Sequence, residues 1–202
     1  MSATAALIAS TLNAGTPLLL AGIGILIHER SGVLNLGIEG IMLMGAVAGF
    51  GTCYLTGSFF LGFAAAALVG MVLSALFGFL TLGLYANQNA AGLAMAIFGA
   101  GLAAFIGQPL QGVSLAARAS EGIPFLRDIP FVGDAFFSSH VLVYVALFMA
   151  GAAACFLYKS RWGLILRAAG ESPKSAYALG YPVRTIRFAA LLFGGLMTGV
   201  AG

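Results

Sequence analysis

Six runs of apolar residues, most of them close to the length of a bilayer-spanning helix, constrain this chain more than any other feature of its sequence. A helix needs about 20 mostly apolar residues to cross the hydrocarbon core of a bilayer. The runs cover residues 7–27, 36–55, 59–82, 90–107, 141–158 and 188–202. They predict an all-α, polytopic integral membrane helix bundle that forms one domain over residues 1–202.

Composition supports this class and excludes others. Of the 202 residues, 61% are hydrophobic and 7% are charged, whereas a soluble domain carries about 25% charged residues. This balance excludes a soluble enzyme, a disordered chain and a nucleic-acid binder, and the net charge of +3 is too small for a DNA-binding face. The 29 glycines fit closely packed transmembrane helices, as in the patterns Gly45-x-x-x-Gly49 and Gly195-x-x-x-Gly199.

The last apolar run is shorter than the others. Residues 188–202 provide 15 positions, fewer than the roughly 20 that a crossing helix needs. The sequence stops there without a polar flank, so we expect the chain to be truncated at its C-terminus, as part of a longer protein. The alternative is a short terminal helix packed inside the bundle.

Basic residues gather in one interval between the runs. Residues 159–187 contain six of the nine Lys and Arg residues and one acid, Glu171. The positive-inside rule places this interval in the cytoplasm. Residues 108–140 contain two basic and three acidic residues, so we expect an external loop there, ordered as a cap and interrupted by Pro124 and Pro130. Counting back from these two intervals places the N-terminus outside.

The start of the second run contains features that disturb a regular span. Gly32, Gly37 and Gly40 weaken a helix, so a broken or re-entrant helix is an alternative, and it could reverse the side of the N-terminus. Glu39 is the only charge well inside an apolar run. It either stays near the cytoplasmic interface and stabilises the broken helix end, or it lies in a translocation path.

A short helix is predicted inside the cytoplasmic interval. Ser172 suits the N-cap and Pro173 the first helical position, while Gly180 and Pro182 suit a helix stop. The helix would cover residues 173–179, about 10 Å, which is too short to be stable alone in water. We expect it to dock in a groove of another protein; a solvated loop is the alternative. The side chains that it would expose are Ala176, Tyr177 and Leu179.

Four stretches resemble, in family order, the ABC importer permeases of the branched-chain amino acid/simple-sugar/nucleoside class, most closely those for nucleosides or simple sugars. They are residues 29–40, 86–94, 121–131 and 161–182. The resemblance implies a multi-pass permease subunit in the bacterial inner membrane, surrounded by lipid and working by alternating access. Its partners would be a second permease subunit, cytoplasmic ABC ATPase subunits and an external substrate-binding protein.

The resemblance also assigns roles within the cytoplasmic interval. Residues 159–187 would form the coupling loop, with Trp162 and Arg167 as anchors at the membrane interface. The residues that would couple to the ATPase are Glu171, Ser172, Pro173, Lys174, Ala176, Tyr177, Leu179 and Gly180.

The sequence offers no catalytic centre of its own. Neither Lys159-Ser160 nor Lys174-Ser175 follows the glycines of a phosphate-binding loop, so ATP would be bound and hydrolysed by the partner. We expect no cofactor and no metal in this chain, because His28 and His140 fall at opposite membrane faces in the predicted topology.

Polar residues near the cytoplasmic ends of the runs could line a translocation path or tie helix ends together. These candidates are Asn35, Glu39, Asn87, Gln88 and Asn89. An ion-coupled secondary transporter is the alternative function, but it calls for embedded charges in several spans, and only Glu39 qualifies. A membrane scaffold is a further alternative, which leaves the signals for the short cytoplasmic helix unexplained.

Overall fold

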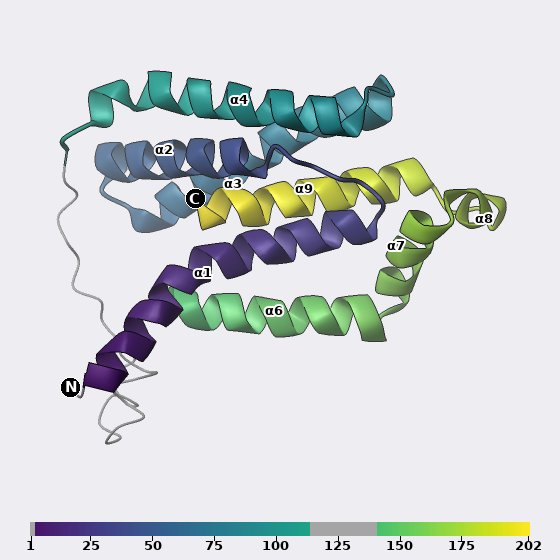
Figure 1. The fold of residues 1–202 in the computed structure, drawn as a ribbon, viewed down its shortest axis with the longest axis horizontal. Coiled ribbons are helices and arrows are strands. Elements are labelled where there is room, and N and C mark those ends of the chain that lie inside the picture. Colours follow the sequence, from purple (N-terminus) through teal and green to yellow (C-terminus); the bar gives the residue numbers. More distant parts are fainter. Residues whose placement is uncertain (1–2, 114–140) are drawn as a thin grey trace.

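The computed structural model of the chain describes residues 3–113 and 141–202, and these residues form a bundle of long helices without a strand (Figure 1). Six helices contain a stretch that is long and apolar enough to cross a membrane. They are α1 Ala3–Arg30, α2 Ile38–Thr56, α3 Phe59–Gly78, α4 Gln88–Gly107, α6 Val141–Lys159 and α9 Val183–Ala201. The predicted helical membrane bundle is therefore confirmed.

The sixth span differs from its prediction. Helix α9 begins at Val183, directly after Pro182, and has 19 residues, so the expectation of a run too short to cross is wrong. Its first turns contain Arg184 and Arg187. Hydropathy alone assigns such basic residues to the preceding loop, whereas the backbone is already helical there.

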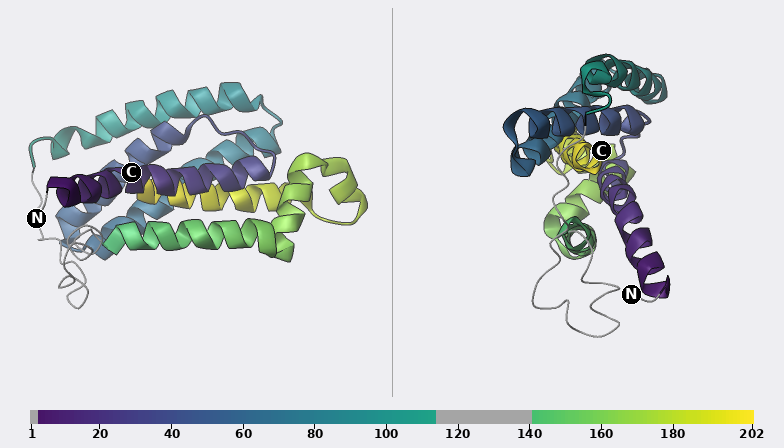
Figure 2. Two further views of the ribbon diagram at one scale, coloured as in Figure 1. Left: turned by 60° about the horizontal axis from the view of Figure 1, so that its bottom comes forward. Right: turned by 90° about the vertical axis from the view of Figure 1, so that its left-hand side faces the viewer.

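Helix α9 occupies the centre of the bundle. It packs against α1, α2 and α3, while α4 lies outside α2 and α6 lies outside α1 (Figures 1 and 2). Close contact depends on glycine at the crossing with α3. A Cβ on Gly199 would overlap the Ala66 carbonyl, and a Cβ on Gly195 would overlap the Gly70 carbonyl and the Ser74 side chain. The Gly195-x-x-x-Gly199 pattern thus lets two backbones approach within the chain.

Shorter elements complete the described part of the chain. Helix α3 continues as a π-helix, η1 Phe79–Gly83, and α4 continues as a 3₁₀ turn, η2 Gln108–Leu110. The interval between α6 and α9 contains two helices, α7 Arg161–Glu171 and α8 Pro173–Ala178. The external cap predicted for residues 108–140 falls almost wholly outside the described residues.

The connections between spans gather at two ends of the bundle. One end holds the α1–α2 linker (residues 31–37), the turn before α4, and helices α7 and α8 (Figure 1). The start of α1 and the turn between α2 and α3 lie at the other end. This arrangement matches the predicted topology, in which the three polar connections share one face of the membrane.

Candidate functional site

Helix α8 is held by backbone hydrogen bonds at both ends. The N–H of Ala176 donates to the carbonyl of Ser172 at 3.0 Å, and the N–H of Gly180 donates to that of Tyr177 at 2.9 Å. Gly180 has a φ of 85°, a left-handed conformation that favours glycine. The predicted short helix and its glycine stop are confirmed. Ser172 is the N-cap residue, as predicted, but its side chain makes no capping hydrogen bond, because its hydroxyl donates to the Ser175 hydroxyl at 2.7 Å.

Two large apolar side chains project from this helix and its C-cap. Tyr177 and Leu179 are each 76% exposed, whereas Ala176 is 2% exposed. The prediction that Ala176 is exposed is therefore wrong: helix α8 packs on α7 and α9, and Ala176 lies on the covered face. Tyr177 and Leu179 are thus the large apolar side chains on the exposed surface of α8 and its C-cap. The charged side chains of Glu171 and Lys174 are exposed beside them.

Helix α7 supports α8 and was not predicted. Ser160 caps it by accepting a hydrogen bond from the N–H of Gly163 at 2.9 Å. Gly163, Leu166 and Ala169 are buried on one side of the helix. The signal in the sequence was a Ser N-cap followed by small or apolar residues at every third position, which is typical of an amphipathic helix.

The two predicted interface anchors both belong to α7. Trp162 is exposed and lines an apolar groove of about 600 Å³ between α6, α7 and α9. The guanidinium carbon of Arg167 lies 5.3 Å from the centre of the Tyr158 ring, a distance suited to a cation–π interaction. Both placements are consistent with a helix at a membrane interface.

A hydrogen-bonded junction joins α7 to the end of α1. Arg187, in the second turn of α9, donates from Nε to the carbonyl of Ser31 at 2.9 Å and from Nη2 to the carbonyl of Ala169 at 2.9 Å. Ser31 and Ala169 are both fully buried. From its sequence context Arg187 counts only as a loop charge, because its partners are backbone atoms that no side-chain pattern reveals.

Three of the predicted path residues bind backbone N–H groups. Asn35 Oδ1 accepts from the N–H of Gly37 at 2.8 Å, and Gln88 Oε1 accepts from the N–H of Leu34 at 2.9 Å. Asn87 Oδ1 caps α4 by accepting from the N–H groups of its first residues at 3.0 and 3.2 Å. Of these contacts, the Gln88 bond joins the α1–α2 linker to the start of α4, whereas the Asn35 and Asn87 bonds stay within the linker and within the first turn of α4. All three amides thus have structural contacts with the backbone.

The α1–α2 linker runs inward beside α4 before α2 begins (Figure 1). Leu34 meets α4 at Gln88, whereas Gly37 meets it at Gly92 and Met95. Seven residues of helix correspond to about 10 Å, so α2 starts about two turns beyond the level at which α4 starts. The break at the start of the second run, which was the alternative to a regular span, is present, and the start of α1 lies at the end of the bundle opposite the linker.

Glu39 and Asn89 differ from the amides that bind backbone groups. Glu39 lies in the first turn of α2 and is exposed. Its neighbour Gly40 packs on the backbone of Ala96 in α4, which places Glu39 deeper along the bundle than the ends of the other spans. Asn89, in the first turn of α4, is also exposed.

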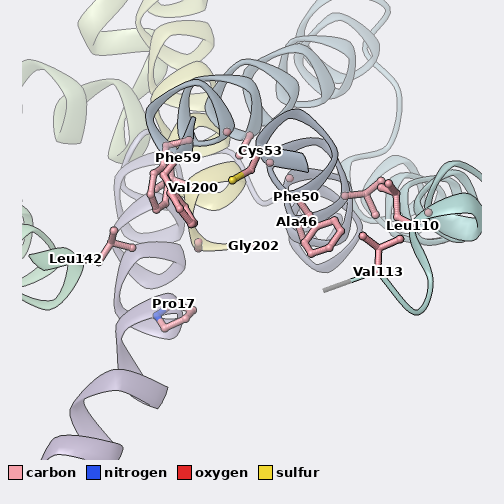
Figure 3. Close-up of a pocket in the computed structure, with 18 of the residues that line it drawn as sticks. Pro17, Ala46, Phe50, Cys53, Phe59, Leu110, Val113, Leu142, Val200 and Gly202 are labelled. Carbon is pink, nitrogen blue, oxygen red and sulfur yellow. The ribbon is translucent and has the colours of Figure 1, made fainter. Parts of the chain in front are cut away.

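A cavity of about 730 Å³ lies toward the opposite end of the bundle (Figure 3). Its walls are mostly apolar and include Phe50, Phe59 and Leu110, and none of the predicted coupling or path residues lines it. Within residues 3–113 and 141–202, no group of three or more His, Cys, Asp or Glu side chains is placed to hold a metal ion.

Comparison with known proteins gives one family and three similar relatives. Residues 7–202 match the family described as branched-chain amino acid transport system / permease component. A Haloferax volcanii protein named as a glucose ABC transporter permease is 41% identical over all of this chain and 63% of its own length. A nucleoside ABC transporter permease of Lactococcus lactis and a guanosine ABC transporter permease of Bacillus subtilis are 33% and 32% identical, each over 97% of this chain and 65% of their own length. The chain thus spans less than two thirds of each relative, and no solved structure matches it.

Proposed function

This chain belongs to the branched-chain amino acid transport system / permease component family, and on that premise we propose that it forms the translocation path of an ABC importer for nucleosides or simple sugars. A separate ATPase subunit would supply the energy. Relatives named as glucose, nucleoside and guanosine ABC transporter permeases support the substrate class. The ion-coupled alternative has no comparable support.

The exposed surface of α8 is the observation that carries this proposal. A helix of 6 residues is not stable alone in water, yet α8 is fixed by its contacts with α7 and α9. It presents Tyr177 and Leu179 at the polar end of the bundle. Large apolar side chains exposed together suggest a protein contact, and this contact would be the docking site of the ATPase.

The remaining coupling residues would shape and flank that site. Pro173 and Gly180 fix where α8 begins and ends, and buried Ala176 holds its inner face against the bundle. Glu171 and Lys174 add one charge of each sign at the border of the contact. Ser172 and Ser175 link their hydroxyls across the first turn.

The proposed mechanism is alternating access. ATP binding would close the ATPase subunits, move α8 with them, and bias the bundle from one of two conformations to the other. Hydrolysis would take place on the ATPase, while this chain contributes the surface that receives the movement. A second permease subunit would complete the path, and an external binding protein would deliver the substrate.

Within the path, we assign the direct substrate contacts to Glu39 and Asn89 first. Both are exposed polar side chains beside the α1–α2 linker and the start of α4. A carboxylate and an amide can hydrogen-bond the hydroxyl groups of a sugar or nucleoside. Asn35, Asn87 and Gln88 would act on the path indirectly, because their side-chain oxygens hold the backbone around it.

Purification from native membranes tests this proposal. The protein is tagged, extracted with a mild detergent and captured, and its co-purifying chains are identified by mass spectrometry. We expect an ABC ATPase and, at the external face, a substrate-binding protein. Capture of the Leu179→Asp variant in parallel should lose the ATPase and keep the other chains. Recovery of the wild-type protein without any ATPase would contradict the proposal.

A further inference from the structure

Arg187 joins three parts of the chain that are distant in sequence. Its guanidinium binds the carbonyl of Ser31, at the start of the α1–α2 linker, and the carbonyl of Ala169, in the last turn of α7. Figure 1 shows the ends of α1 and α7 meeting the start of α9 at this point. The two carbonyls are separated by more than a hundred residues of chain, and one side chain connects them.

The chemistry of this junction favours arginine. The last carbonyls of a helix lack partners within the helix and carry its negative dipole end, and both α1 and α7 end here. A planar guanidinium can donate to two acceptors at once and keeps its positive charge. The residues around the guanidinium are closely packed: a Cβ on Gly32 would lie 2.8 Å from Arg187 Nη2 and 3.0 Å from the Cα of Gly170.

The junction also lies between the proposed docking helix and the linker that leads into α2. Helix α8 packs on α7 and α9, so a displacement of α8 acts on both. Arg187 belongs to α9 and binds α7 directly, and its second bond is to the linker. The linker then runs along α4 from Gln88 to Met95. Helix α2 begins directly after it, with Glu39 in its first turn.

We infer that Arg187 is the positioning residue that transmits movement of α8 to the α1–α2 linker, and thereby couples the ATPase to the translocation path. This inference rests on the proposed function. A cap that served stability alone would need only to satisfy the two carbonyls. The transmission role requires in addition that the linker move together with α7 when the ATPase binds nucleotide.

The test uses the full-length protein, assembled with its ATPase and binding protein in proteoliposomes. Substrate uptake and ATP hydrolysis are measured together for the wild type, Arg187→Gln and Arg187→Lys. The matched control is Arg184→Gln, because Arg184 lies one turn earlier on α9 and is placed over the Tyr85 ring at 5.9 Å. For Arg187→Gln we expect hydrolysis to persist while substrate moved per ATP falls by about tenfold, within the range of coupling between sites.

A second readout follows the linker directly. Leu34, which is exposed on the linker, is replaced by cysteine after Cys53 and Cys155 have been changed to alanine, and its maleimide labelling rate is compared with and without ATP. In the wild-type background the rate should depend on nucleotide, and with Arg187→Gln this dependence should vanish. The rate with Arg184→Gln should behave as in the wild type.

The outcomes separate this inference from the proposed function. Wild-type protein without ATP-driven uptake would contradict the proposed function and the inference with it. The inference alone would be contradicted if the wild type takes up substrate and Arg187→Gln keeps both the amount of substrate moved per ATP and the labelling response of the wild type. This holds even if Arg187→Gln has a lower melting temperature. If Arg187→Gln fails to assemble, Arg187→Lys decides by the same criteria, because it keeps the charge without the two-pronged geometry.

Discussion

Some residues of α8 and its C-cap are covered by the bundle and others are exposed, and the exposed ones make the proposed contact apolar. Ala176 is buried against the bundle, while Tyr177 and Leu179 project from it. The sequence predicted the helix itself, because Pro173 and Gly180 have strong positional preferences. It could not predict which side faces α7 and α9, since that depends on a helix, α7, whose presence was missed.

Replacing Leu179 with Asp should uncouple the ATPase without unfolding the protein. The side chain is exposed, so the charge costs little in the isolated chain, but it would be desolvated in an apolar contact. We expect weakened ATPase binding and lost uptake with an unchanged melting temperature, measured by co-purification, transport assay and thermal unfolding. Leu179→Met is the apolar control and should behave as wild type. Normal uptake by Leu179→Asp would remove Leu179 from the docking surface.

Asn35 offers a test of whether a predicted path residue is structural. Its side chain is buried and accepts the hydrogen bond of the Gly37 N–H. Asn35→Ala leaves that buried N–H without its partner and should cost about 1–3 kcal/mol in stability, seen as a lower melting temperature in detergent. Asn89→Ala, at an exposed position, is the control and should not lower it. Equal melting temperatures for the two variants would argue against a structural role of Asn35 in the linker.

Among the elements, the length of the apolar runs predicted the membrane spans, but it missed helical segments that contain charged residues. Five of the runs became spans with small shifts at their ends. Helix α7 was missed because its exposed face carries Arg161 and Glu171, so the segment as a whole reads as a polar loop. The start of α9 was missed for the same reason, with Arg184 and Arg187 in its first turns.

The crossing of α9 with α3 should be sensitive to any added side chain. A Cβ on Gly199 would overlap the Ala66 carbonyl, so Gly199→Leu should force the two helices apart and cost about 1–3 kcal/mol, as overpacking typically does. Thermal unfolding in detergent measures this loss. Gly101→Leu is the matched control, because a Cβ on Gly101 meets nothing within 4 Å. A melting temperature of Gly199→Leu equal to that of the control would refute the close packing.

The whole molecule is a multi-pass membrane protein that presents its polar connections, with α7 and α8, at one end. Charge distribution predicted this arrangement, since six of the nine basic residues fall in residues 159–187. The sequence did not reveal the junction of Arg187 with Ser31 and Ala169. Such contacts join backbone groups across the fold, and they depend on how α1, α7 and α9 converge rather than on any local pattern.

ATP-driven import is tested by uptake into proteoliposomes that contain the full-length protein with its ATPase and binding protein. Labelled nucleoside or sugar is supplied on the side of the binding protein. ATP or a non-hydrolysable analogue is supplied on the side of the ATPase, and in a separate sample an ion gradient is imposed instead. We expect uptake with ATP, none with the analogue or with the gradient alone, and loss of ATP-driven uptake with Leu179→Asp. Uptake driven by an ion gradient in the absence of ATP would contradict ATP-driven import.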